Sequence, residues 1–287
     1  RYVDLFDVSD MNNPILSGAL ETKDRFSLSA PHDVDRYGDY ILIVDPNGFA
    51  PPVGKLGLFK VMEQGRVLPV DEWQLVGRTE GKELIGANRV QVKGDYAIIG
   101  GSYTRAAREE AGVGFAHMAV VDISDPTNPT IVAEEPFYDY RGPNGLTIAG
   151  NVAFCAGGQT VAAYDISNPA KPVPLASQSF PIYREADRTD NYHDLIYRDG
   201  HLYISAQSDN GFLILKVEDE KIRKLADEIQ SISPAIQPPV KIKSNDKAPK
   251  RFHMTTRILH FSSSPWQLII ASTCNGLRSR FLDEVSR

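Results

Sequence analysis

Cysteine and long apolar runs are both scarce in this sequence. Its 287 residues include two cysteines, Cys155 and Cys274, which are too few for a disulfide scaffold and carry no CxxC metal spacing. The richest apolar stretch, Trp266 to Ala271, is as long as a strand and far below the ~18 residues that a membrane helix requires. These shortages exclude a disulfide-rich miniprotein and a membrane-spanning helix.

Basic residues are outnumbered as well. The chain has 31 lysines and arginines against 37 aspartates and glutamates, which gives a net charge of -6. Domains that bind nucleic acid are usually basic, so nucleic acid is not expected as a partner. The composition, 42% hydrophobic and 24% charged, is that of a globular protein and excludes wholesale disorder.

Three common catalytic motifs are missing: the GxSxG nucleophile elbow, the GxxxxGK[ST] phosphate loop and the HExxH metal helix. No complete catalytic constellation can therefore be identified along the chain. A signal peptide is missing too, and the chain begins at Arg1 rather than Met. We interpret it as a processed or trimmed product.

What the sequence does contain is a repeated phrase, apolar-Asp-(Val/Ile)-Ser-(Asp/Asn)-x-x-x-Pro. It occurs at 6–14, 121–129 and 164–172, each time between two runs of strand-forming residues. Asp, Ser and Asn side chains bond the backbone of tight turns, and Pro fixes φ there. Each copy therefore predicts a strand, a tight turn and a second strand.

A second phrase alternates with the first. It is a glycine-polar-apolar turn between two apolar strands, and its glycines recur every 50 to 56 residues, at Gly38, Gly94, Gly150 and Gly200. Almost no helical periodicity lies between these hairpins. Hairpins repeated at this interval predict four-stranded blades arranged radially.

Together the two phrases resemble the LVIVD-repeat β-propeller family. The resemblance extends over nearly the whole chain, with degenerate copies at 60–63 and 216–219. It implies a propeller of four-stranded antiparallel blades. Because members are mostly secreted or surface-associated prokaryotic proteins, it also implies an extracellular, periplasmic or cell-surface location. Many members have no assigned activity, so the resemblance informs the fold more than the function.

We therefore predict one all-β propeller domain over residues 1–287, with five blades, or six or seven if the chain is trimmed. Strands A to D of a blade run from the axis outward. The A–B pairs are predicted at 32–45, 88–100, 144–156, 193–206 and 256–272, and the C–D pairs at 56–76, 118–134, 160–177 and 211–225. Residues 2–20 supply a C–D pair that closes the ring on the last blade, and 276–282 a further C strand. Helix is expected only as a turn or two at 106–111 and 225–229.

The long insertions all fall between B and C strands or between D and A strands. They are 102–117, 181–192 and 229–252, with a shorter one at 45–55. In a propeller these connections share one face, and insertions gathered on one face of a repeat fold usually mark its binding face. The basic run 241–251 within the last insertion is interpreted as a solvated loop.

The same face receives a ring of polar residues. Aligned by their turns, the five predicted A strands place His32, Asn88, Asn144, His193 and Thr256 at one equivalent position. The next position carries Asp33, Arg89, Gly145, Asp194 and Arg257. Because strand A lines the central channel, we expect these groups at the channel mouth, with His32 and His193 in one site. The ligand-binding residues are thus predicted to be His32, Asp33, Asn88, Arg89, Asn144, His193, Asp194 and Arg257.

Three interpretations of the ring stay open. His32, Asn88, Asn144 and His193 could hold one divalent metal ion, with calcium favoured by the amide oxygens and zinc by the imidazoles. The His-Asp pairs could supply a general base for catalysis. Alternatively the ring is structural, with Asp33 and Asp194 pairing Arg89 and Arg257 between blades. His117 is interpreted as a loop residue, and the two cysteines as buried free thiols.

Two functions follow from these features. The first is a secreted or surface-associated binding or assembly module whose long-loop face holds another protein or a surface polymer. The second is a metal-dependent hydrolase or lactonase-like enzyme at the channel mouth; six-bladed lactonases hold calcium with Asn and Asp there, an analogy of fold alone. The sequence leaves open whether the protein is an enzyme.

Overall fold

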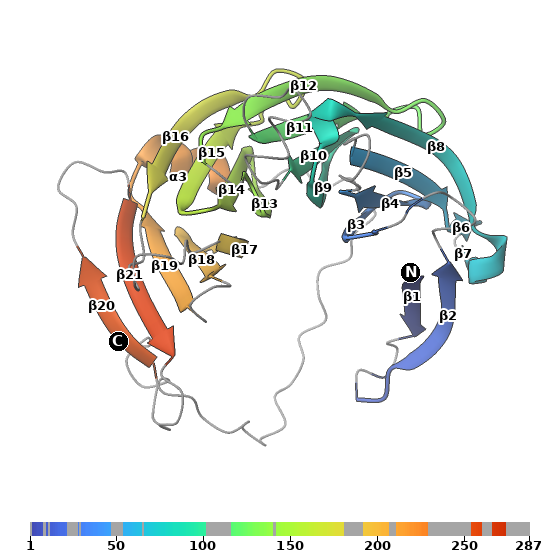
Figure 1. Ribbon diagram of the computed structural model, residues 1–287, viewed down its shortest axis with the longest axis horizontal. Coiled ribbons are helices and arrows are strands. Elements are labelled where there is room, and N and C mark those ends of the chain that lie inside the picture. Colours follow the sequence, from blue (N-terminus) through green and yellow to red (C-terminus); the bar gives the residue numbers. More distant parts are fainter. Residues whose placement is uncertain are drawn as a thin grey trace.

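The computed structural model consists of β-strands, with one α-helix and two short 3-10 helices among the residues it describes. Described are residues 2–7, 10, 12–21, 28, 30–46, 54–64, 66–101, 116–139, 142–180, 192–206, 211–228, 254–259 and 266–273. Figure 1 shows four sheets that follow one another around an arc. The predicted class, all-β with four-stranded antiparallel blades, is confirmed.

The first three sheets each order their strands as the chain makes them. The first sheet contains β3 (Asp33–Tyr37), β4 (Tyr40–Asp45), β5 (Gly54–Lys60) and β8 (Gln74–Gly81). The second contains β9 (Ala87–Lys93), β10 (Tyr96–Gly101), β11 (Ala116–Asp122) and β12 (Thr130–Phe137). The third contains β13 (Gly145–Ala149), β14 (Val152–Gly157), β15 (Thr160–Asp165) and β16 (Val173–Ser179). Their innermost strands, β3, β9 and β13, occupy the predicted A positions.

Two-residue turns join the first and second strands of these sheets. Gly38, Gly94 and Gly150 have φ values of 55°, 57° and 50°, a region that favours glycine over other residues. Tyr37 pairs directly with Tyr40 across the first of these turns. The glycine phrase therefore forms the predicted hairpins.

The aspartate phrase forms the outer turns. Asp122 Oδ1 accepts hydrogen bonds from the backbone N–H of Ser124 at 2.9 Å and from its hydroxyl at 2.6 Å. Asp165 and Ser167 repeat both bonds at the same distances. These contacts satisfy N–H groups of the turn that have no partner in the pairing of the strands. The predicted strand–turn–strand units are therefore confirmed.

The fourth sheet differs from the prediction in its outer half. Its order is β17 (Tyr192–Arg198), β18 (His201–Ala206), β19 (Gly211–Val217), β21 (Trp266–Thr273) and β20 (Met254–Leu259). The hairpin expected as an A–B pair at 256–272 does form, but its predicted place is wrong. Strand β21 pairs with β19, and β20, which carries Thr256 and Arg257, is outermost.

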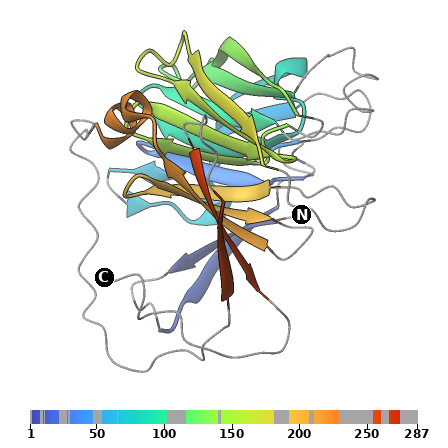
Figure 2. The same cartoon turned by 90° about the vertical axis from the view of Figure 1, so that its left-hand side faces the viewer.

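The cause lies in the segment that follows β19. Of the C–D pair expected at 211–225, the C strand forms as β19, but the D strand is wrong, because residues 220–227 form the helix α3 (Glu220–Asp227). The Asp219 side chain caps this helix by accepting from the N–H groups of Lys221 and Ile222. The outer edge of β19 is then open to β21. The helical turn expected at 225–229 is real but begins earlier, and Figure 2 shows α3 beside the sheets.

The remaining described elements lie beside the first sheet. The hairpin of β1 (Tyr2–Asp7) and β2 (Ile15–Glu21) confirms the pair predicted at 2–20. Between β5 and β8 lie β6 (Met62–Glu63), β7 (Arg66–Val67) and the 3-10 helix η1 (Val70–Glu72); η2 (Lys82–Leu84) precedes β9. The segments at 106–111 and 276–282 lie outside the described residues, and the blade number stays a prediction.

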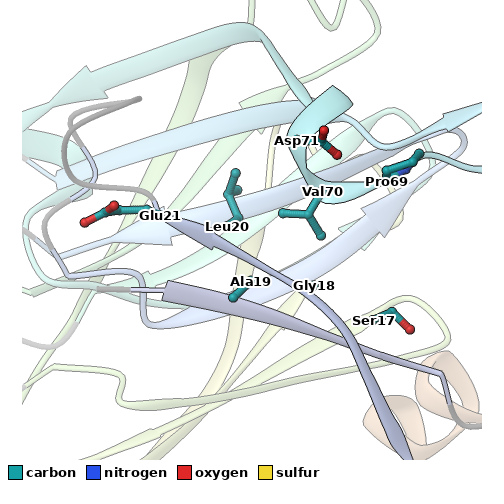
Figure 3. Close-up of a pocket in the computed structure, with 8 residues that line it drawn as sticks. All are labelled: Ser17, Gly18, Ala19, Leu20, Glu21, Pro69, Val70 and Asp71. Carbon is teal, nitrogen blue, oxygen red and sulfur yellow. The ribbon is translucent and has the colours of Figure 1, made fainter.

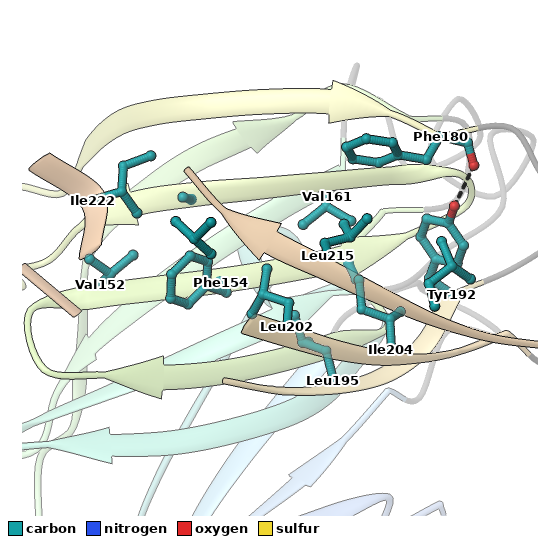
Figure 4. Packing of buried hydrophobic residues seen from close by; sticks show 14 of the residues in the cluster. Val152, Phe154, Val161, Phe180, Tyr192, Leu195, Leu202, Ile204, Leu215 and Ile222 are labelled. Carbon is teal, nitrogen blue, oxygen red and sulfur yellow. Dashed lines mark hydrogen bonds between the residues drawn. The ribbon is translucent and has the colours of Figure 1, made fainter. Parts of the chain in front are cut away.

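Apolar clusters fill the spaces between successive sheets. Figure 4 shows the cluster between the third and fourth sheets, where Phe154 and Val161 face Leu202 and Leu215. The Tyr192 hydroxyl donates to the carbonyl of Phe180, so its polar atom is satisfied inside this cluster. Contacts of β3 with β9, β9 with β13 and β13 with β17 continue the stacking along the inner edge.

Candidate functional site

The inner strands begin at one end of the sheets, and four equivalent residues meet there. We call this cluster the mouth; it consists of His32, Asn88, Asn144 and His193, with Arg89 and Asp194 beside them. His32 Nδ1 lies 3.1 Å from the carbonyl oxygen of Asn88. The Asn88 amide donates to the side-chain oxygen of Asn144, which is 4% exposed. The first three sheets are thus linked through their predicted ring residues.

Arg89 extends the ring of polar contacts to the fourth sheet. Its guanidinium donates to the carbonyl of Asn88 at 3.2 Å and to the carbonyl of His193 at 3.3 Å. The Asp194 carboxylate lies 3.6 Å away and forms an ion pair with it. This pair between the predicted residues spans the intervening third sheet. Arg89 is mostly buried, so its charge acts on the mouth from within the protein.

His193 is kept neutral more strongly than an ordinary histidine. Burial lowers its pKa first, the positive charge of Arg89 lowers it further, and His32 acts in the same direction. The influence of His32 places the two histidines in one electrostatic environment. The His193 imidazole makes no hydrogen bond within the described part of the chain.

Glycine at the third of the positions that follow the ring residues, Gly145, has a steric reason. A Cβ on Gly145 would lie 2.9 Å from Leu195 Cδ2 and 3.0 Å from Asp194 Cα. The inner strands β13 and β17 therefore approach too closely for any side chain here. This close approach is what brings Asp194 within reach of Arg89.

Asp33 and Arg257, the two remaining predicted residues, do not belong to the mouth cluster. Asp33 accepts a hydrogen bond from the N–H of Val90 at 3.0 Å, and Asp35 one from Val92 at 2.6 Å. These carboxylates satisfy the donors of the next inner strand, and among the described residues Asp33 does not form the ion pair with an arginine that one interpretation of the ring had expected. Arg257 is not at the mouth, because β20 is the outermost strand of its sheet.

The contacts that Asp33 and Asp35 make with the next inner strand continue in the second sheet, and we call this series the inner-strand belt. Gln91 Oε1 accepts from the N–H of Ile148 at 2.7 Å, the counterpart of the Asp35 contact one sheet earlier. Burial raises the pKa of Asp35. The belt protects the innermost edges from water and from other strands. Its signal was the common spacing of Asp35 and Gln91 from their turn glycines.

The opposite end of the inner strands is closed by side chains. We call this the turn end. The Tyr37 hydroxyl donates to Asp95 at 2.7 Å, and the Lys93 ammonium donates to the Gly150 carbonyl at 2.7 Å and to Asn151 Oδ1 at 2.8 Å. Tyr197 donates to Asp227 at the end of α3 at 2.8 Å. Each contact joins one sheet to the next element.

A metal site is not completed by the described residues. No group of three His, Cys, Asp or Glu side chains among them is placed to hold an ion. One amide oxygen of the proposed set, that of Asn144, already accepts from Asn88. Calcium or zinc on His32, Asn88, Asn144 and His193 stays a prediction.

Two pockets lie away from the mouth. One pocket of 470 Å³ lies between β2 and η1. Figure 3 shows its lining, with Leu20 and Val70 near Gly18. A second pocket of 760 Å³, lined by Phe6 and Val67 among others, adjoins the same hairpin. Both belong to the junction of the β1–β2 hairpin with the first sheet rather than to the mouth.

Other residues singled out by the sequence have structural positions. The prediction that His117 lies in a loop is wrong. It is buried in β11, and its Nδ1 lies 3.9 Å from a carboxylate oxygen of Glu134. Cys155 is confirmed as a buried free thiol, whose pKa is raised by burial. Cys274 lies outside the described residues, as do most of the predicted loops at 102–117, 181–192 and 229–252. Within the described ranges, no helix has the length and apolar character needed to cross a membrane.

Comparisons with known proteins agree with the repeat pattern. Residues 112–134 and 144–177 match the model of the LVIVD repeat, so the chain carries LVIVD repeats in its second and third sheets. No curated protein matches the chain. A solved structure of a functionally unknown protein from Desulfotomaculum acetoxidans DSM 771 is similar to it with 11% identity and a TM-score of 0.41, over 75% of this chain and 76% of that one.

Proposed function

We propose that this LVIVD-repeat chain is a non-catalytic binding module that holds another protein or a surface polymer at its mouth. One observation carries the proposal: equivalent positions of four sheets converge there in a single polar cluster. The predicted connections between strands also leave the sheets at this end. A site assembled from several repeats is the usual way in which repeat proteins recognise partners.

The chemistry of the mouth supports binding. His32 and Asp194 are exposed and offer an imidazole and a carboxylate side by side, with Asn88 half-buried next to them. Such a mixed set suits a ligand with both kinds of hydrogen-bonding group, such as a peptide backbone or a polysaccharide. None of the six residues of the mouth is a serine, threonine or cysteine that could act as a nucleophile, so the hydrolase remains the second alternative.

We also propose that the protein works outside the cytoplasm, secreted or attached to the cell surface. The support is the LVIVD repeat, whose family members the sequence resembles. Nucleic acid is not proposed as a partner, since the net charge is -6.

The test measures retention of the fluorescently labelled protein on washed cells of the organism that makes it. We expect the double variant His32→Ala/His193→Ala to bind at least about tenfold less, because recognition energy concentrates in a few central groups. Its melting temperature should stay within a few degrees of the native value. The matched control, Asp122→Ala at the turn end, should bind as the native chain does.

Treating the cells with protease separates the two partner classes, because only a protein partner is destroyed. Equal retention of the double variant and the native chain would contradict the proposal. Loss of retention in Asp122→Ala with an intact fold would place recognition at the turn end. A metal ion held in stoichiometric amount, found by elemental analysis of protein purified without chelator, would favour the hydrolase instead.

A further inference from the structure

The connection between the two outer strands of the first sheet departs from the repeat. In the second and third sheets this connection is a short turn, at 123–129 and 166–172. In the first sheet it runs over 61–73 and contains β6, β7 and η1. Its helix η1 contacts β2 of the N-terminal hairpin. The first sheet therefore has a wall beside β2 to which those two short turns have no counterpart.

A slot lies between β2 and this wall. It is the 470 Å³ pocket of Figure 3, bordered by residues 17–21 of β2 and 69–71 of the connection. Successive side chains of a strand point to opposite faces, so a pocket that borders five successive residues follows the edge of the strand. Every second residue of an antiparallel strand directs its N–H and C=O away from the paired strand. The slot therefore receives backbone donors and acceptors of β2.

The two faces of β2 differ in chemistry along this edge. Leu20 is 1% exposed and belongs to one apolar cluster with Leu68 and Val70. Glu21, the next residue, lies on the opposite face of the strand and is exposed. A strand added at this edge would therefore place its residues alternately beside an apolar surface and beside a carboxylate.

A wider pocket continues the slot, and we call the two together the groove. The wider pocket measures 760 Å³ and shares Ser17 and Pro69 with the slot. The half-exposed side chains of Phe6 and Val67 border it. Among the described residues that border the groove, the charged ones are all carboxylates: Asp7, Glu21 and Asp71. An apolar groove with this charge is complementary to a partner that carries both apolar and basic side chains.

We propose that the groove binds an extended segment of a partner protein in which basic and apolar residues alternate, and that this segment adds to β2 as a further strand. The backbone of β2 supplies main-chain hydrogen bonds, and the apolar surface receives side chains of one parity. Glu21 and Asp71 attract the basic side chains of the other parity. Because the groove lies away from the mouth, the inference goes beyond the proposed function and does not rest on it.

The probe is the capped, fluorescein-labelled hexapeptide KVKIKV, and its binding to the full chain is measured by fluorescence anisotropy. We expect saturable binding that weakens as salt is added, because exposed charges are screened. The peptide EVEIEV keeps the apolar residues and reverses the charge. A third peptide is KVKIKV methylated on the backbone nitrogens of its two central residues, which removes an N–H that faces β2 in either alignment. Both should bind at least about tenfold more weakly than KVKIKV.

Two exposed positions of the groove are changed in the protein. Val67→Lys removes apolar surface, and Glu21→Lys reverses the charge beside the slot. Each should weaken the binding of KVKIKV at least about tenfold while circular dichroism stays native. The matched controls lie outside the groove: Val132→Lys on the exposed rim of the second sheet, and Glu80→Lys on β8. Both controls should bind the peptide as the native chain does.

Hydrogen exchange locates the bound peptide. Addition of a strand to β2 should slow amide exchange within 15–21 and leave exchange in β16 unchanged. The mouth variant His32→Ala/His193→Ala should bind KVKIKV as the native chain does. This result and the cell-retention result can therefore fail separately.

Four outcomes would overturn the proposal. They are the absence of saturable binding, equal binding of the methylated peptide, equal losses in the groove variants and their controls, and unchanged exchange within 15–21. A native dimer that Val67→Lys dissociates in sedimentation would identify a second copy as the occupant and would overturn it as well.

Discussion

The two ends of the inner strands use their side chains differently. At the turn end, Tyr37, Lys93 and Tyr197 each donate to the next element of the arc at 2.7 to 2.8 Å. At the mouth, the links run through Asn88 and Arg89, while the imidazole of His193 has no hydrogen bond within the described residues. The inner strands are thus hydrogen-bonded to the next element at the turn end, and at the mouth they retain side-chain groups that can still form hydrogen bonds.

This difference separates stability from recognition. A buried polar group whose bonds are all made within the protein holds the sheets in place, and its loss is costly. A partly exposed group with unused donors and acceptors contributes little to folding and is available to a ligand. Variants of Lys93 at the turn end should therefore change stability, and variants of His32 and His193 at the mouth should change binding.

The largest effect on stability is expected at Lys93. Lys93→Ala leaves the Gly150 carbonyl and Asn151 Oδ1 without their donor at a position that is 6% exposed. Unmet acceptors in such a site cost free energy, and we expect a loss of about 3 kcal/mol in unfolding free energy. Denaturant titration measures it. A loss no greater than that of an exposed lysine, such as Lys171→Ala, would remove the distinction between the two ends.

A smaller effect is expected at the outer turns. Asp122→Ala and Asp165→Ala each remove two bonds from a serine in an exposed turn, at a cost of about 1 kcal/mol in unfolding free energy. Cell retention should be unaffected in both variants. If either one lost retention while its melting temperature held, the turn end would take part in recognition.

The smallest effect is the pH dependence contributed by His193. Its pKa in the folded protein is lowered by burial and by Arg89, so the unfolded chain, with a pKa of about 6.5, takes up the proton first as pH falls. Stability is therefore fully present above about pH 6.5 and declines below it. His193→Gln should flatten this decline between pH 7.5 and 5.5, as followed by denaturant titration. An unchanged slope would show that His193 titrates normally.

Local features of the fold were well predicted from the sequence, and non-local ones were not. The glycine and aspartate phrases act within a few residues, so the hairpins of the first three sheets follow from them. Helix α3 had a local signal, the Asp219 cap followed by Ile222 and Ala226 one turn apart, which the search for a D strand passed over. The place of β21 beside β19 depends on an edge left open by that helix.

The mouth shows the same difference between local features, which were predicted, and non-local ones, which were not. Register along the inner strands was enough to align His32, Asn88, Asn144 and His193. Their contacts depend on the distance between sheets, which Gly145 reduces and no alignment reveals. Charge alone suggested the pairing of Arg89 with Asp194, whereas the hydrogen bond from the Val90 N–H to Asp33 was not predicted because it depends on that distance.

Histidine modification tests the division between the two ends within a single protein. His32 and His193 lie at the mouth, and His201 begins β18 directly after the hairpin turn at the opposite end, where its Nδ1 is 2.8 Å from the Asp199 carbonyl. Diethylpyrocarbonate modification of each is measured by mass spectrometry with the protein free and bound to washed cells. Binding at the mouth predicts slower modification of His32 and His193 and an unchanged rate at His201. Protection of His201 with unchanged His32 and His193 would contradict the account.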